Sequence, residues 1–69
     1  PDIFIAFPSD PFHGLFIEMK SEKGRLTAAQ VVMLDRLAQQ GYKCAVCYGW
    51  EEAKNVILTY LNGKLNVKQ

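Results

Sequence analysis

Two charged side chains stand at the end of an apolar run, where a strand would ordinarily end in neutral residues. Residues 14–20 read Gly-Leu-Phe-Ile-Glu-Met-Lys, so Glu18 and Lys20 are two positions apart. Because strand side chains repeat with period two, both point to the same face. Another acid, Asp2, precedes the apolar run at residues 3–7. Two carboxylates and a lysine at strand ends can bind a divalent cation and activate water, which is the chemistry of metal-dependent phosphodiester cleavage.

The two apolar runs predict an antiparallel hairpin. Strands are expected at residues 2–7 and 14–20, and the segment between them is rich in the turn residues Pro, Ser and Asp. A turn centred near residues 10–11 would place Asp2 roughly opposite the end of the second strand. We therefore expect the carboxylates of Asp2 and Glu18 to lie within reach of one cation.

A helix is predicted after the polar segment that follows the hairpin. Thr27 and Gln30 have the spacing of a capping box, and Gly41 suits the C-cap. Gln30 has two interpretations that do not exclude each other: it caps the helix, or its side chain turns toward a bound water or phosphate. The residues alone favour the cap. Apolar positions recur at helical spacing and are expected to face the core: Val31, Leu34, Leu37 and Ala38.

The remainder of the chain predicts a strand, a helix and a tail. The strand is expected at residues 42–48, and the helix at residues 51–61, with Gly63 stopping it. Residues 64–69 are expected to form a polar tail. The resulting order is β-β-α-β-α, and the unit from residue 14 to residue 48 has the length of a crossover between parallel strands. The inner face of the last helix is expected to carry Ala53, Val56, Ile57, Tyr60 and Leu61.

Composition limits the class of protein. Sixty-nine residues allow one domain, which buries only about 60% of its unfolded surface. With 49% hydrophobic and 22% charged residues, the chain has a globular composition, and its net charge of +1 gives no global field that would attract nucleic acid. It contains no apolar run of the ~20 residues that span a bilayer and no recognisable signal peptide. We expect an intracellular protein without membrane contact.

Each charged candidate also has an ordinary structural explanation. Taken alone, Glu18 and Lys20 are explained as a surface ion pair, which contributes little to stability. Lys23 and Arg25 flank Gly24 in a basic loop beside the expected site. Contact with DNA phosphates and simple solvation explain this loop equally well.

Four further residues are chemically capable but are not needed for the metal-dependent cleavage suggested above. Cys44 and Cys47 form a C-x-x-C, but residues three apart in a strand point to opposite faces, which suits neither zinc nor a redox pair. His13 is the only histidine and is interpreted as a loop residue. Trp50 is interpreted as a packing or interface aromatic rather than one that stacks on bases. A thiol-based redox protein remains the weakest alternative.

The combined spacing is more specific than Glu-x-Lys alone. Asp2, residues 14–20 and residues 24–30 together resemble the virus-type replication-repair nuclease (VRR-NUC) domain, a family of the PD-(D/E)xK nuclease superfamily. The similarity covers nearly the whole chain. It continues through Leu37, Gly41, Tyr42, Val46, Cys47, Glu52 and Ala53.

The resemblance implies a metal-dependent DNA endonuclease that uses Mg²⁺ or Mn²⁺. By the family pattern, Asp2 and Glu18 would bind the metal together with the backbone carbonyl of Met19. Lys20 would be the catalytic lysine, and Gln30 the polar residue of the motif helix. With the resemblance, a catalytic role becomes the preferred explanation of Glu18 and Lys20 over a surface ion pair, and of Gln30 over a helix cap alone.

The resemblance also implies a fold and a partner. The fold is a restriction-endonuclease-like α/β core, a mixed sheet flanked by helices, in the family order α-β-β-β-α-β. The chain, one domain over residues 1–69, matches from the second strand onward. We therefore expect an N-terminal truncation that removes the leading helix, its acidic residue and the first strand.

Stand-alone members of the family resemble Holliday-junction resolvases, which implies branched DNA as substrate. A homodimer, or a second chain that supplies the missing part, and a phage or bacterial origin are expected. The alternative is a non-catalytic module that uses the same fold for DNA binding or dimerisation.

Overall fold

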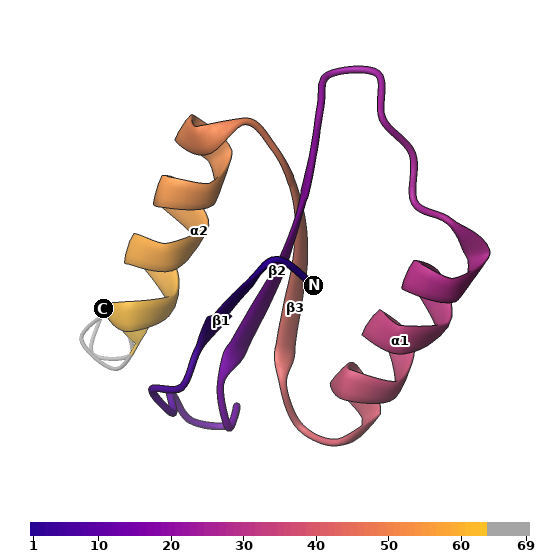
Figure 1. Cartoon of the computed structure of the whole chain (residues 1–69). Helices are drawn as coiled ribbons and strands as arrows, with labels where there is room; N and C mark the ends of the chain where they lie inside the picture. Colours follow the sequence, from indigo (N-terminus) through magenta and orange to yellow (C-terminus); the bar gives the residue numbers. More distant parts are fainter. Residues whose placement is uncertain (64–69) are drawn as a thin grey trace.

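Five elements follow one another in the predicted order β-β-α-β-α. The computed structural model describes residues 1–63 of the chain, and the predicted tail at residues 64–69 lies outside them. A three-stranded mixed sheet lies between two helices, which confirms the α/β class (Figure 1). Among residues 1–63, no helix has the length and apolar character needed to cross a bilayer. The elements are β1 (Ile3–Ile5), β2 (Leu15–Lys20), α1 (Ala28–Gln39), β3 (Lys43–Tyr48) and α2 (Trp50–Leu61).

The sheet has the order β1-β2-β3, with β2 in the centre. β1 is antiparallel to β2 and places Ile3 opposite Ile17, which confirms the predicted hairpin. β2 and β3 are parallel and place Lys20 beside Tyr48, which confirms the predicted crossover through α1. The carboxyl ends of β2 and β3 therefore lie at the same edge of the sheet.

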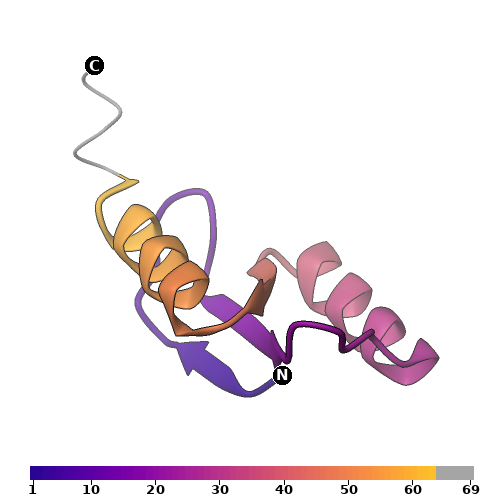
Figure 2. The ribbon, with the colours of Figure 1, turned by 90° about the horizontal axis from the view of Figure 1, so that it is seen from above.

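The core lies between the sheet and α2. Alternating residues of β2 and β3 point toward this helix, which covers one face of the sheet, whereas α1 lies to the side, next to β3 (Figure 2). Tyr60 also ties α2 to the hairpin, because its hydroxyl donates a hydrogen bond of 2.7 Å to the Phe7 carbonyl. The buried residues of this core are Leu15, Ile17, Cys47, Ala53 and Tyr60.

Helix α1 begins and ends as its sequence predicts. The Thr27 hydroxyl accepts a hydrogen bond from the Gln30 backbone, and the Gln30 side chain accepts one from the Thr27 backbone, so the capping box is complete. At the other end Gln40 is the C-cap, and Gly41 follows with φ of +96°. The Gly41 N–H bonds to the Ala38 carbonyl and the next N–H bonds to the Leu37 carbonyl, both over 3.1 Å. This is a Schellman motif, which needs glycine at the left-handed position.

Three expectations about the inner faces of the helices are wrong. Val31 is 50% exposed and Ala38 is also exposed, because α1 packs beside the edge strand β3 chiefly through Leu34 and presents only a narrow stripe to the sheet. Leu61 is 40% exposed because it is the last residue of α2.

Two boundaries are also corrected. The first strand is shorter than predicted: it runs from Ile3 to Ile5, and the backbone has left the strand before Pro8. Helix α2 begins at Trp50, one residue before its predicted start, and ends at Leu61 as predicted, with Asn62 as its C-cap directly before Gly63.

The two cysteines lie on opposite faces of β3, as predicted. Cys47 is buried in the core against α2, whereas the Cys44 thiol lies 3.5 Å from the Leu34 carbonyl of α1. Burial raises the pKa of both thiols above the ordinary value. Both are free and protonated at neutral pH, so the interpretation of this C-x-x-C as a structural feature holds.

Candidate active site

Backbone pairing fixes Asp2 against the end of β2. Its own N–H donates to the Ile17 carbonyl over 2.9 Å, which extends the hairpin by one residue beyond β1. Its carboxylate oxygen Oδ2 accepts a hydrogen bond of 2.7 Å from the Met19 N–H. Asp2 therefore reaches across to the residue that follows Glu18, as the position of the hairpin turn predicts.

Glu18 lies in β2, and its carboxylate is buried beside the first turn of α1. The residue is only 5% exposed, although it is charged, and it lies on the opposite face from Ile17 and the core. Oε2 accepts a hydrogen bond of 3.2 Å from Gln30 Nε2, and Oε1 lies 3.4 Å from the Pro1 nitrogen. A buried carboxylate needs a donor such as the Gln30 amide, because burial of an unpaired charge is costly. Neither partner of Glu18 was foreseen from the sequence.

Gln30 closes the predicted cap and also contacts the site with the same side chain, whereas its predicted contact with a bound water or phosphate stays a prediction. Its Oε1 accepts a hydrogen bond of 3.0 Å from the Thr27 N–H and closes the capping box. Its Nε2 donates to Glu18. The amide group therefore connects the first turn of α1 to the centre of the site, and the cap explains only half of its hydrogen bonds.

Lys20 lies on the same face of β2 as Glu18, two residues further along, and is half-buried. Within residues 1–63 no ion pair joins these two side chains, so the explanation of Glu-x-Lys as a surface salt bridge is wrong. The positive charge of Lys20 does act on Asp2, where it helps to lower the pKa of the carboxyl group. Lys20 thus lies near Asp2 and on the same face as Glu18, and its ammonium group forms no ion pair with either carboxylate among residues 1–63.

The pKa of Asp2 is lowered by its surroundings. The largest cause is the hydrogen bond from the Met19 N–H, which stabilises the ionised form. Partial desolvation acts in the opposite direction and raises the pKa, but hydrogen bonding with the Glu18 side chain lowers it again. Asp2 is therefore an ionised carboxylate at neutral pH.

The donors present suit a hard divalent cation. No group of three His, Cys, Asp or Glu side chains converges anywhere in residues 1–63, which is unlike a zinc site. The carboxyl groups of Asp2 and Glu18 do approach each other, and two adjacent carboxylates repel unless a cation or proton lies between them. Mg²⁺ and Mn²⁺ are bound by one or two carboxylates with waters completing the shell. The ligand role of the Met19 carbonyl stays a prediction.

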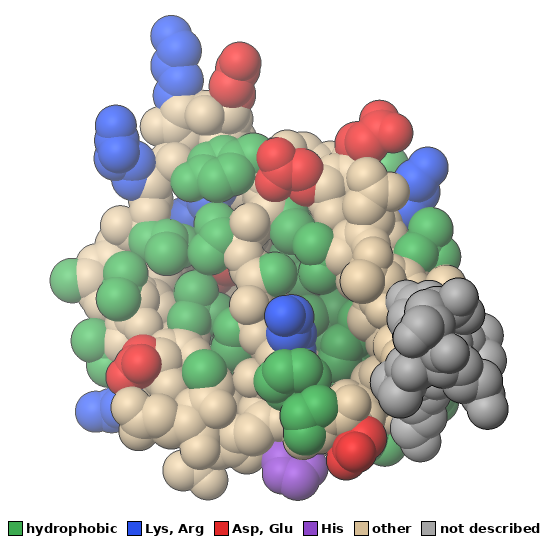
Figure 3. All heavy atoms as spheres, turned by 180° about the vertical axis from the view of Figure 1, so that it is seen from behind, with side chains coloured by type: hydrophobic (Ala, Val, Ile, Leu, Met, Phe, Trp, Pro, Cys, Tyr) green, Lys and Arg blue, Asp and Glu red, His purple; other side chains and the backbone are tan. Residues whose placement is uncertain are grey.

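The two candidate DNA-contacting residues lie in the loop from β2 to α1. Lys23 and Arg25 are both exposed, and the Gly24 N–H between them bonds to the Ser21 carbonyl over 2.9 Å. The loop rises from the carboxyl end of β2 (Figure 1), and charged side chains project from this end of the molecule (Figure 3). Their contact with DNA stays a prediction.

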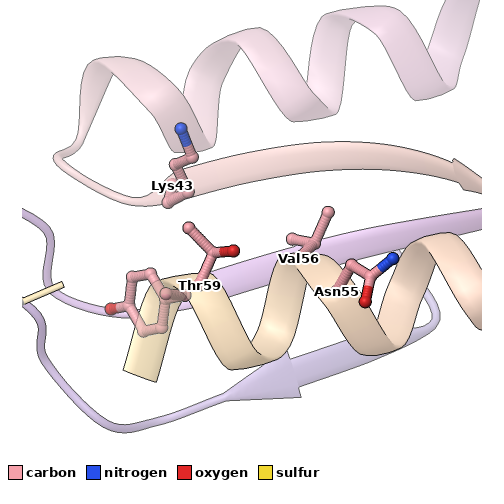
Figure 4. Close-up of a pocket in the computed structure, with 5 residues that line it drawn as sticks. Lys43, Asn55, Val56 and Thr59 are labelled. Atoms are coloured by element: carbon pink, nitrogen blue, oxygen red, sulfur yellow. The ribbon is translucent and has the colours of Figure 1, made fainter. Parts of the chain in front are cut away.

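A cavity of about 300 Å³ lies elsewhere, between β3 and α2 (Figure 4). It is on the opposite face of the sheet from Glu18 and contains none of the four predicted catalytic side chains. The candidate site is thus a surface at a sheet edge rather than this cavity. The cavity is lined by Lys43, Asn55, Val56, Thr59 and Tyr60.

Two aromatic residues near the site differ from their interpretation or were overlooked. Trp50 is 64% exposed, so the packing half of its interpretation is wrong for residues 1–63, and the interface half stays a prediction. Tyr48 is 42% exposed and lies beside Lys20 in the parallel pairing. The predicted crossover could have indicated this position of Tyr48, because it makes the strands parallel and brings their last residues, Lys20 and Tyr48, to the same end of the sheet. His13 is an exposed loop residue, as predicted.

A titration of stability tests the position of Asp2. Because the folded-state pKa is lowered, the ionised carboxylate stabilises the fold above its unfolded-state pKa, and this contribution is lost as the pH falls through the folded-state pKa. Asp2→Asn should therefore lower the free energy of unfolding at about pH 7 more than at about pH 2. Urea unfolding of wild type and variant at both pH values measures the difference. A larger effect at the acidic pH would contradict the Met19–Asp2 hydrogen bond.

Thr27 and Gln30 offer a matched pair of variants for the double role of Gln30. Thr27→Ala and Gln30→Ala each remove part of the capping box, so each should lower the free energy of unfolding by about 1 kcal/mol. Only Gln30→Ala removes the donor to Glu18. The carboxyl ¹³C chemical shift of Glu18 should therefore change in Gln30→Ala and stay near the wild-type value in Thr27→Ala. Equal changes in the two variants would argue against the side-chain bond.

The comparison with known families agrees with this geometry. The family model of the VRR-NUC domain matches residues 1–51, which include both carboxylates, Lys20, Gln30 and the three strands. A search of curated proteins and a search of solved structures gave no match. Because the matched segment covers well over half of the chain, the protein belongs to the VRR-NUC domain family, a family of nucleases.

Proposed function

We propose that this chain is the catalytic core of a DNA endonuclease that hydrolyses phosphodiester bonds with the help of Mg²⁺ or Mn²⁺. One observation carries the proposal: Asp2, Glu18 and Lys20 come from two neighbouring strands to one end of the sheet, and Gln30 holds Glu18 there. Membership of a nuclease family supports DNA as the partner. A surface site at a sheet edge also suits a polymer, which needs an open approach.

The side chains have separate roles in this proposal. Asp2 and Glu18 hold the cation, with the Met19 carbonyl as a third oxygen ligand. When bound, such a cation polarises the scissile phosphate and lowers the pKa of water. Lys20 orients the attacking water and stabilises charge that develops on the phosphate. Gln30 keeps the Glu18 carboxylate in one orientation through the hydrogen bond from Nε2.

DNA binding in this proposal depends on local rather than global charge. The net charge is only +1, so attraction must come from the basic loop that carries Lys23 and Arg25. Because this loop begins directly after Lys20, phosphates bound there lie next to the catalytic lysine. We further propose selectivity for branched DNA, in the manner of a Holliday-junction resolvase, and action as a homodimer.

Lys20 gives the most direct test of catalysis. Lys20→Ala should reduce cleavage by about 100-fold or more, since it removes a charge that acts mainly in the transition state. Folding should be retained, because Lys20 is half-buried and makes no ion pair within residues 1–63. Cleavage of linear and branched DNA with Mn²⁺ provides the measurement.

The matched control for Lys20 is Lys43→Ala, which removes an exposed lysine from the opposite face of the sheet. This variant should cleave like the wild type. Cleavage by Lys20→Ala at the wild-type rate would refute the assignment.

Glu18 tests the metal itself. Glu18→Ala should abolish binding of Mn²⁺ in calorimetric titration, whereas Lys20→Ala should retain it. Glu18→Gln keeps the shape and hydrogen-bonding capacity of the buried side chain, so it separates loss of charge from loss of packing. Wild type that binds DNA without binding Mn²⁺ would favour the alternative, a non-catalytic DNA-binding module.

A further inference from the structure

Two exposed aromatic residues lie at the end of β3 and the start of α2, and the first of them is the register partner of Lys20. Trp50 is 64% exposed, which is the largest exposed fraction among the exposed large hydrophobic residues of the described chain, and Tyr48 is 42% exposed. Singly exposed hydrophobic residues are ordinary on protein surfaces, whereas neighbouring exposed apolar side chains can mark a binding surface. Their position relative to Lys20 favours a binding surface.

The parallel pairing of β2 and β3 brings Tyr48 to the site. Tyr48 is the register partner of Lys20, and side chains alternate along both strands, so both side chains lie on the same face as Glu18. Trp50 begins α2 two residues later. The loop with Lys23 and Arg25 leaves the sheet from the same end, at the top of Figure 1.

The turn that carries Trp50 is fixed by its backbone. The Tyr48 N–H donates a hydrogen bond of 2.9 Å to Glu52 Oε1, which ties the end of β3 to the first turn of α2. Gly49 between them has φ of +94° and ψ of 163°, a conformation that is essentially restricted to glycine. Trp50 is thus held at a defined place while its ring remains in solvent.

The other aromatic residues on this face have partners. Phe4 and Phe16 stack with ring centroids 4.4 Å apart, and Tyr42 meets both edge-on, near the opposite end of the strands. Within residues 1–63, neither Tyr48 nor Trp50 belongs to such a pair. Tyr48, beside Lys20, and Trp50, two residues further along the chain, therefore both expose rings that pack on no other aromatic ring of the described residues.

We propose that Tyr48 and Trp50 form a stacking surface for unpaired nucleobases at the edge of the catalytic site. This inference rests on the proposed nuclease function and specifies its substrate class: DNA with single-stranded nucleotides next to the scissile phosphate. Bases inside a duplex cover one another's faces, whereas an unpaired base can lie on an aromatic ring. Lys23 and Arg25 would bind the adjoining phosphates. The protein selects a junction or flap because it offers stacking only to bases that have left the duplex.

Trp50 is the only tryptophan of the chain and reports on its own environment. A thymidine oligonucleotide and a duplex of equal length are titrated into the Lys20→Ala variant without divalent metal, while tryptophan fluorescence is followed. The single strand should quench the emission and bind more tightly than the duplex. Trp50→Ala should weaken single-strand binding, measured by anisotropy of a labelled oligonucleotide, about fivefold or more. Trp50→Phe should retain most of the affinity.

The matched control is Phe7→Ala, which removes an equally isolated ring that is 50% exposed beyond the other end of β1. It should leave single-strand affinity unchanged. Wild-type affinity in Trp50→Ala would overturn the inference. So would a change in the sedimentation mass of Trp50→Ala with unchanged DNA affinity, because the aromatic surface would then be a protein interface.

The two proposals fail separately. Single-strand binding, measured by anisotropy, that Trp50→Ala weakens in a protein whose wild type cuts no DNA would support the stacking surface and refute the nuclease. Cleavage that depends on Lys20 but not on Trp50, with equal rates on duplex and branched DNA, would support the nuclease and overturn the stacking surface.

Discussion

The side-chain amide of Gln30 is the interaction on which the candidate site depends. Its oxygen closes the first turn of α1, and its nitrogen holds the buried carboxylate of Glu18. The two bonds use opposite ends of one planar group, so the position of the helix and the orientation of the carboxylate are set together. Replacement by a glutamate would keep the cap but bring a second negative charge to Glu18, whereas glutamine supplies both an acceptor and a donor.

Much of this arrangement follows from local patterns in the sequence. The capping box, the Schellman glycine at Gly41 and the alternation in β2 each depend on residues a few positions apart, and all are confirmed. The hairpin turn predicts the proximity of Asp2 and Glu18 because an antiparallel pair has one register once its turn is placed. Nearly all of the fold could be predicted in this way.

Features that depend on the relative placement of whole elements could not be predicted. Helical periodicity in α1 indicates an inner face, but not that this helix lies beside β3 and buries Leu34 while Val31 stays in solvent. The bond from Gln30 to Glu18 requires the distance from α1 to β2, which no sequence spacing contains. The exposure of Trp50 is of the same kind, because an aromatic residue at a helix start is equally compatible with a core and with a surface.

The hydrogen bonds that build the site span long stretches of chain. Asp2 and Met19 are 17 residues apart, and Gln30 and Glu18 are 12 residues apart. The first bond forms only after the hairpin has closed, and the second only after α1 has returned to the sheet, so the cost of closing two loops precedes the complete site. The site therefore exists only in the completed tertiary structure. No partly folded form of the chain would hold both carboxylates in place, so the chemistry proposed here would be confined to fully folded molecules.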